Sequence, residues 1–123
     1  MPQTVSYCHC SDCRRLSGAP VAAFAAFDPS VVTFAPALGP PVSHVEGVER
    51  WFCTACGTQL AACYAYLPGQ LYVPLGLLDQ AAELPPCLHS HHASRLPWLH
   101  LTDDLPRQGA SARASLNLEN HLK

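Results

Sequence analysis

Three cysteines near the N-terminus have the spacing of a metal-binding loop. Cys8, Cys10 and Cys13 form a C-x-C-x2-C array. In an extended segment, residues 8 and 10 project to the same side, and a turn after Cys10 would bring Cys13 back to meet them. Three thiolates favour zinc, which binds cysteine sulfur tetrahedrally and here keeps a fourth position. A protein ligand in that position makes the site structural, whereas water or substrate makes it catalytic.

The residues just after this array are candidates for substrate binding. Arg14 and Arg15 offset the net negative charge of three thiolates and Zn²⁺, orient the sulfurs or attract an anionic group. Ser17 offers a hydroxyl donor and Gly18 a backbone donor. An open zinc–thiolate site suits thiol chemistry, because zinc lowers the pKa of a bound thiol, whose sulfur then adds to an aldehyde carbonyl.

A second cysteine motif, Cys53 to Gly57, has the form C-x2-C-G. Two interpretations compete for Cys53 and Cys56. They are half of a four-ligand zinc site, or they are a redox pair of the thioredoxin type. The redox interpretation requires the motif to open a helix in a βαβ unit. Residues 59–64 favour a strand instead, so half of a zinc site is the preferred hypothesis.

Composition limits the class of protein. The chain has 123 residues, of which 49% are hydrophobic and 13% charged, with a net charge of −2. This composition predicts one domain with a hydrophobic core. The chain lacks the excess of basic residues typical of nucleic-acid binding. No apolar run approaches the length of a membrane span, and residues 1–10 contain no signal sequence. Seven cysteines in such a chain point to reduced thiols in the cytoplasm.

The elements that position these residues are predicted to be mainly strands. Twelve prolines disfavour long helices. Pro68-Gly69 between two apolar segments predicts a hairpin. One helical turn is expected at 79–84, an irregular segment at 96–106, and a frayed tail or short helix from 107 onward. Strands are predicted at 4–7, 21–27, 31–34, 42–48, 50–52, 59–66, 70–75 and 88–93.

These motifs, in this order, resemble the Gfa family, also called the glutathione-dependent formaldehyde-activating enzyme and centromere protein V family. The resemblance covers roughly residues 5 to 107. Its most specific parts are the two cysteine motifs and the later Arg-x-Pro-Trp segment. The matching segments are Cys8 to Arg15 with Ser17-Gly18, Trp51 to Leu60, Gly76 to Asp79, Pro86 to His89, Arg95 to Trp98 and Asp103 to Pro106.

The resemblance implies a mainly β fold, a β-tent of antiparallel sheets with zinc-binding loops. It assigns the catalytic-type zinc to the first cysteine array and half of a structural zinc site to Cys53 and Cys56. The family's other half-site is a C-x-C pair before the catalytic array, and this sequence has none. One zinc site is therefore expected, with the second incomplete. Replacement ligands, if used, would come from Cys63, Cys87, His89, His91 and His92.

The resemblance also implies function and organisation. A single Gfa-like domain is expected at 1–106, followed by a C-terminal tail at 107–123. The leading hypothesis is a carbon–sulfur lyase-type enzyme acting on adducts of a small aldehyde with glutathione or a similar thiol. His89 matches a family position and is a candidate substrate contact, or else a packed histidine. The alternatives are a non-catalytic zinc module and, third, a thiol redox protein. Exposed strand edges favour a homo-oligomer.

Overall fold

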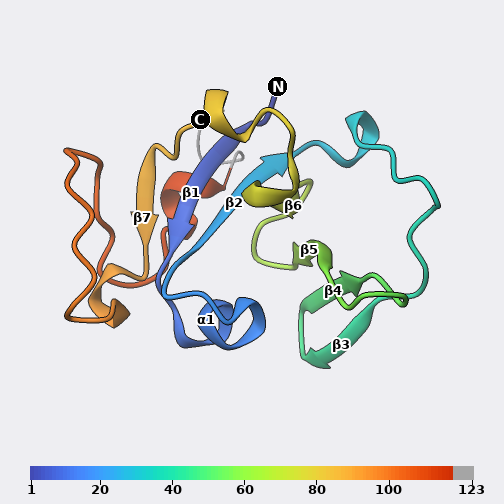
Figure 1. The fold of residues 1–123 in the computed structure, drawn as a ribbon, viewed down its shortest axis with the longest axis horizontal. Helices are drawn as coiled ribbons and strands as arrows, with labels where there is room; N and C mark the ends of the chain where they lie inside the picture. The colour runs from blue at the N-terminus through green and yellow to red at the C-terminus, as the bar shows by residue number, and fades with distance from the viewer. Residues whose placement is uncertain (118–123) are drawn as a thin grey trace.

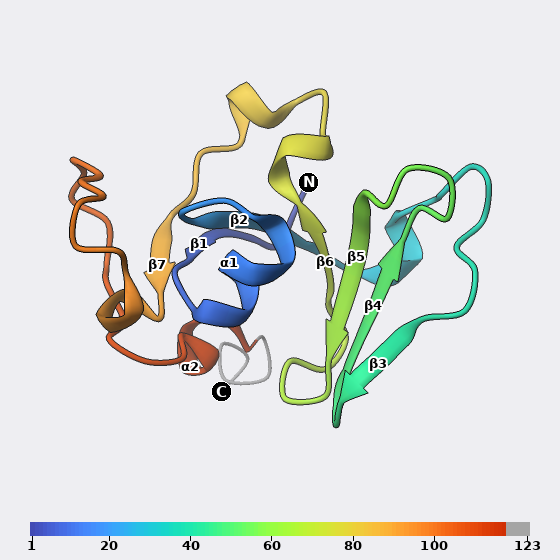
Figure 2. The same ribbon diagram turned by 60° about the horizontal axis from the view of Figure 1, so that its bottom comes forward.

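A computed structural model describes residues 1–117 and places seven strands in one mixed sheet (Figure 1). The strand order is β3-β4-β5-β6-β2-β1-β7. In Figure 2, β7, β1 and β2 lie to one side and β5, β4 and β3 to the other, with β6 between them. The strands are β1 (Thr4–Cys8), β2 (Ala22–Phe27), β3 (Val42–Val45), β4 (Val48–Phe52), β5 (Gln59–Tyr64), β6 (Leu71–Pro74) and β7 (Leu88–Ser90).

Helical segments are short, as the proline content predicts. Helix α1 (Ser11–Ser17) follows β1, and helix α2 (Arg113–Leu116) lies near the C-terminus. Four single 3₁₀ turns join other elements: η1 (Pro29–Val31), η2 (Leu75–Leu77), η3 (Ala81–Glu83) and η4 (His92–Ser94). Within the described residues, no helix is long and apolar enough to span a membrane.

Several predicted strands are confirmed, including the hairpin of β5 and β6 around Pro68-Gly69. The strands expected at 42–48 and 50–52 are instead divided by a turn at Glu46-Gly47 into β3 and β4, and the one expected at 88–93 ends at Ser90 before η4. The strand expected at 31–34 is wrong. Pro29 begins a 3₁₀ turn, and the Asp28 carboxylate caps it by accepting the Ser30 amide at 2.9 Å. Val32 and Phe34 pack onto the core from irregular chain instead. Burial of apolar side chains therefore does not require a strand here.

Two further expectations are corrected by the backbone. The turn expected after Cys10 is the two-turn helix α1, which Gly18 ends in the left-handed conformation, with φ +70°. The sheet is not wholly antiparallel, because β7 pairs with β1 in parallel. That pairing needs a long connection, and residues 9–87 provide it with five other strands.

Strand register divides the side chains between two faces. Arg50 lies opposite Ala62, Ala62 opposite Tyr72, and Tyr72 opposite Ala26. Ala26 in turn pairs with Thr4, four residues before Cys8 on the same strand. Because strand side chains alternate, these positions share one face with Cys8. The sheet thus carries a cysteine of the first motif and an arginine from β4 on one surface.

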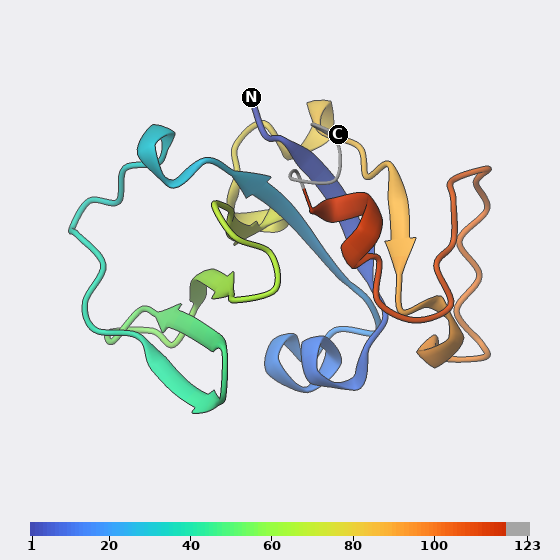
Figure 3. The same cartoon turned by 180° about the vertical axis from the view of Figure 1, so that it is seen from behind.

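The largest core cluster covers this face. It contains Phe24, Tyr72 and Leu88 from the strands, with Cys13, Leu67, Ala112 and Leu116 among the side chains packed above. Figure 3 shows α2 on this side of the molecule, against β1. The Ala112 amide donates to the Ser90 hydroxyl at 3.3 Å, which fixes the segment before α2 to β7. Two smaller clusters, around Ala25 and Val73, lie on the opposite face.

Candidate metal centre

The three cysteines of the first motif reach one point from three kinds of backbone. Cys8 is the last residue of β1 and pairs with Ala22 and Ser90. Cys10 is the N-cap of α1, and its sulfur accepts the backbone amide of Cys13 at 3.3 Å. Cys13 lies in the first turn of the helix and is buried. Strand end, cap and first turn therefore form a rigid frame for the three sulfur atoms.

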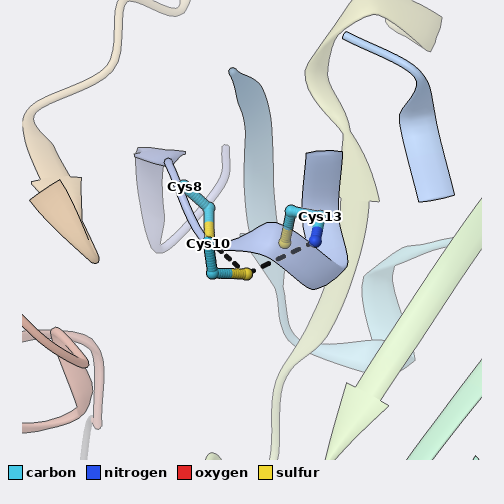
Figure 4. A group of neighbouring side chains, drawn as sticks. All are labelled: Cys8, Cys10 and Cys13. Atoms are coloured by element: carbon cyan, nitrogen blue, oxygen red, sulfur yellow. Dashed lines mark hydrogen bonds between the residues drawn. The ribbon is translucent and has the colours of Figure 1, made fainter. Parts of the chain in front are cut away.

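The sulfurs are close enough to bind one ion. All three Sγ atoms lie within 4.8 Å of one another, and those of Cys8 and Cys10 are 3.4 Å apart. A tetrahedral zinc with Zn–S bonds of about 2.3 Å needs sulfurs about 3.8 Å apart. Figure 4 shows the Cys10 sulfur joined by dashed lines to the Cys8 sulfur and to the Cys13 amide nitrogen. The donor set and its spacing fit zinc without a large rearrangement.

Hydrogen bonding among the thiols makes their acidities unequal. Hydrogen bonds from the Cys13 and Cys8 side chains lower the pKa of Cys10 to about 2. The hydrogen bond with Cys10 raises the pKa of Cys8 to about 12, and hydrogen bonds with Cys10 and Cys8 raise that of Cys13, with burial adding to both shifts. Cys10 is therefore the most acidic thiol of the three. Binding a metal ion would release the protons that the thiols still carry.

A cavity of about 330 Å³ opens beside the three cysteines. A pocket of this size suits a small molecule rather than a macromolecule. Among the described residues, no fourth histidine, cysteine or carboxylate joins the three sulfurs as a metal donor. Beside Cys8, Cys10 and Cys13, it is lined by Ser6, Asp12, Phe24, Val45, Glu46, Val48, Arg50, Tyr64, Tyr66, Leu67, Tyr72, Ser90, His91, Ser111 and Leu116.

The residues predicted to bind substrate do not line this cavity. Arg14 and Arg15 face a separate hollow that also includes Gly18 and Trp98. The Ser17 hydroxyl donates to the Cys13 carbonyl at 2.7 Å and accepts the Ala19 amide at 3.1 Å, so it closes the end of α1. Their substrate-binding roles, like that of His89, stay predictions.

His89 is fully buried in a polar network on the other side of the sheet from the cysteines. Its Nε2 lies 3.0 Å from an Asp103 carboxylate oxygen, and its Nδ1 lies 2.8 Å from Nε2 of His9. If His89 is neutral and donates from Nε2 to ionised Asp103, then His9 must donate to His89. His9, between Cys8 and Cys10 in the chain, is thereby tied to residue 103.

Arg107 completes this network. Its guanidinium donates to Asp103 at 2.7 Å, to the Leu105 carbonyl at 2.7 Å and to the Leu101 carbonyl at 3.1 Å. Burial, with nearby positive charges, lowers the pKa of His9 to about 4. A neutral His9 packed against His89 anchors the backbone between two of the three cysteines. Sequence reasoning missed Asp103 and Arg107, because nothing in their spacing pairs them with residue 9.

The second cysteine motif lies in the turn between β4 and β5. The Gly57 amide donates to the Cys53 carbonyl at 2.7 Å, and the Cys53 amide donates to the Thr58 carbonyl at 2.8 Å. Gly57 adopts φ +79°, which glycine tolerates best. Cys56 is exposed, and the Thr58 hydroxyl and amide lower its pKa. Among residues 1–117, no histidine, carboxylate or third cysteine joins the pair as a cluster of donors.

The replacement ligands considered from the sequence are placed elsewhere. Cys87 donates to the Val5 carbonyl at 3.2 Å, and Cys63 is half-buried beside Glu49 on β5. His89 is held by the network with Asp103. None of these joins Cys53 and Cys56 in a group of metal donors within the described residues. The pair on the hairpin stays half of a site.

Fold and site together define a mostly β protein with a three-cysteine cluster beside a small-molecule cavity. A family model described as glutathione-dependent formaldehyde-activating enzyme matches residues 1–94, including both cysteine motifs. The chain belongs to this family, as the resemblance in its motifs predicts. A comparison with curated proteins finds no match.

Proposed function

We propose that this protein is a zinc-dependent carbon–sulfur lyase-type enzyme that acts on adducts of a thiol, such as glutathione, with a small aldehyde. The observation that carries the proposal is the three-cysteine cluster at the wall of a cavity of about 330 Å³. Family membership supports the same chemistry. Cys8, Cys10 and Cys13 would hold the zinc, which supplies Lewis-acid activation of a thiol sulfur near neutral pH.

Residues of the cavity wall would limit the access of water and donate a hydrogen bond to the substrate. Phe24, Tyr72 and Leu116 form an apolar surface that limits access of water. Tyr64 packs against the same core cluster as Cys8 and Cys10, and burial raises its pKa. Its hydroxyl therefore stays protonated at neutral pH. It is available to donate a hydrogen bond to the aldehyde oxygen as negative charge develops there.

The proposed reaction conserves atoms without an added oxidant. In the direction of synthesis, a bond forms between the thiol sulfur and the aldehyde carbon, and the thiol proton ends on the carbonyl oxygen. In the reverse direction the carbon–sulfur bond breaks, and the proton returns to sulfur. The enzyme's contribution is to hold the two reactants together and to stabilise the charge on oxygen.

Adduct turnover by the zinc-loaded protein tests the proposal, with Cys10→Ser as the disabled variant. Formation of the adduct from glutathione and formaldehyde is followed by NMR exchange. We expect the wild-type protein to accelerate exchange above the uncatalysed rate and Cys10→Ser to abolish the acceleration. Equal exchange rates for the two proteins, or none above the uncatalysed rate, would overturn the proposal.

The alternatives receive less support. A non-catalytic zinc module would close the site with a fourth protein ligand, and the described residues contribute only three donors. A redox role for Cys53 and Cys56 would favour a helix N-terminus, whereas the pair lies in an antiparallel hairpin turn. Rapid oxidation of this pair in the presence of a chelator would favour the redox function.

Several finer expectations belong to the same proposal. We retain the family's β-tent as the arrangement of the sheet, a Gfa-like domain over residues 1–106 against which Ala112 and Leu116 pack, and a cytoplasmic setting in which thiols stay reduced. The exposed edge strand β3, with Val42 and Val45 nearly half exposed, is the surface we propose for a homo-oligomer. Light scattering of the wild-type protein and a Val42→Lys variant tests that surface.

A further inference from the structure

Arg50 on β4 is a buried charge without an opposite charge beside it. Its side chain is 6% exposed, and Arg50 is the only Lys, Arg, Asp or Glu among residues 1–117 that is buried. The Nε atom makes no hydrogen bond. Both ion pairs in the described part of the chain belong to Asp103. A buried, unpaired guanidinium is costly, so this residue calls for a partner from outside the chain.

The position of Arg50 directs it to the cysteine cavity. Strand register places it on the sheet face that carries Cys8, and it lines the same cavity as the three cysteines. Tyr64 and Tyr66, which also line the cavity, lie close enough for its charge to act on their hydroxyls. The cavity therefore has thiol groups at one wall and a cation at another.

The acidic groups of the cavity do not neutralise this cation. Asp12 and Glu46 also line it, but both are exposed, and neither lies within 4.0 Å of the guanidinium as an ion pair. An anion entering the cavity would meet Arg50 already desolvated, where a charge-assisted hydrogen bond is strong. The planar guanidinium matches a carboxylate with two parallel hydrogen bonds.

We propose that Arg50 binds a carboxylate of the thiol substrate and so restricts the enzyme to thiol carriers that bear an anionic group. This inference rests on the proposed function, because it takes the thiol to occupy the cavity beside Cys8, Cys10 and Cys13. Arg50 thereby replaces Arg14 and Arg15, which face another hollow, as the residue that receives the carboxylate. It determines which thiol is bound and does not take part in bond formation.

A matched pair of ligands tests the assignment through binding. The zinc-loaded protein is titrated calorimetrically with 3-mercaptopropionate and with 3-mercaptopropionamide, which keeps the thiol and the size but lacks the charge. Glutathione and its diethyl ester form a second pair. We expect the carboxylate forms to bind about tenfold to a hundredfold more tightly, as one charge-assisted hydrogen-bonded pair provides. Equal affinity of the wild-type protein for the charged and uncharged ligands would overturn the proposal.

Variants locate the effect at Arg50. Arg50→Met should remove the preference for the carboxylate, and Arg50→Lys should restore part of it. Arg95→Met, which changes an exposed arginine elsewhere, is the matched control and should keep the full preference. Circular dichroism and zinc content establish that each variant is folded and loaded. Loss of the preference in Arg14→Met rather than Arg50→Met would overturn the assignment.

Two further outcomes separate this inference from the proposed function. If Arg50→Met weakens both members of each ligand pair equally, then Arg50 acts as a counter-ion of the thiolates, and the proposal is wrong. If the carboxylate preference depends on Arg50 but no adduct turns over, then the inference stands as a binding assignment and the lyase function fails. If adducts turn over but the carboxylate forms are not preferred, then the lyase function stands and the assignment of Arg50 is wrong.

Discussion

The two cysteine motifs differ in what surrounds them, although each is compact in sequence. Cys8, Cys10 and Cys13 lie at a strand end and a helix start, next to the largest core cluster and a cavity. Cys53 and Cys56 lie in a hairpin turn, where Cys56 is exposed and no third donor is near within the described residues. The comparison shows that a compact cysteine motif becomes a candidate metal centre where a strand end and a helix start hold three sulfurs together beside a cavity. Close spacing of the cysteines is not sufficient.

The first motif also has support beneath it that the second lacks. His9 connects to His89, His89 to Asp103 and Asp103 to Arg107, through hydrogen bonds of 2.7 to 3.0 Å. This network fixes the residue between Cys8 and Cys10. The hairpin turn is held by two backbone hydrogen bonds and a glycine. Substitutions in the His89 network and in the hairpin turn test whether the two motifs differ in stability and reactivity as the structure predicts.

Removing His89 should have the largest effect on stability. The side chain is fully buried, and its loss leaves a cavity and removes the hydrogen-bond partner of His9 and Asp103. We expect His89→Ala to lower the free energy of unfolding by about 3 kcal/mol, measured by urea denaturation. His44→Ala on the exposed strand β3 is the control and should change it by less than about 0.5 kcal/mol. Similar costs for both variants would contradict the role of the network.

Alkylation rates should separate Cys56 of the second motif from Cys13 of the first by a large factor. Cys56 is exposed with a lowered pKa, whereas Cys13 is 7% exposed with a raised pKa. In metal-free protein, we expect iodoacetamide to modify Cys56 at least about a hundredfold faster than Cys13, because only the thiolate reacts. Peptide mass spectrometry over time provides both rates. Comparable rates would mean that the first motif opens freely to solvent.

Substitution of Gly57 should cost less, because it strains one backbone position only. Gly57 has φ +79°, and an added Cβ meets no atom within 4 Å. We therefore expect Gly57→Ala to lower the free energy of unfolding by about 1 kcal/mol. Gly39→Ala, where φ is not positive and the space is equally open, should be neutral. Zinc binding at the first motif should be unchanged in both variants. Loss of zinc binding in Gly57→Ala would show that the first motif depends on the second.

The smallest expected effect is the pH dependence of the free energy of unfolding that comes from Asp103, which supports the first motif through His89. Burial opposes ionisation of Asp103, but hydrogen bonds from His89, the Leu105 amide and Arg107 outweigh it and hold its pKa at about 2. The unfolded value is about 3.9, so Asp103 stabilises the fold above about pH 4 and loses this effect as the pH falls toward 2. The stability difference between wild type and Asp103→Asn should shrink across that window. A constant difference would show that Asp103 does not titrate with folding.

Sequence patterns predicted the local elements better than their assembly. Alternation and turn residues are local signals, so β2, β5 and the hairpin at Pro68-Gly69 could be predicted, whereas the turn between β3 and β4 was missed. The segment 31–34 has β-branched residues but packs without pairing, since Pro29 and the Asp28 cap turn the chain first. The parallel pairing of β1 with β7 joins residues about eighty positions apart, and no local pattern encodes that contact.

The same distinction holds for the site. Cys8, Cys10 and Cys13 are near in sequence, so their cluster could be predicted from spacing alone. Arg50 and Tyr64 come to the cavity through strand register across β4, β5 and β6. One signal was present, because Arg50 alternates in phase with Val48 and Phe52 and is thus a charge on an apolar face. Arg14 and Arg15 were favoured only because they follow the cysteines directly.

Zinc content of three proteins tests the central claim that the first motif is the metal centre. Native mass spectrometry after loading and desalting gives zinc atoms per chain for the wild type, Cys10→Ser and Cys56→Ser. The account predicts one retained zinc in the wild type and in Cys56→Ser, and none in Cys10→Ser, because the variant loses one of three thiolate ligands. Zinc retained by Cys10→Ser and lost by Cys56→Ser would place the metal at the hairpin and contradict the account.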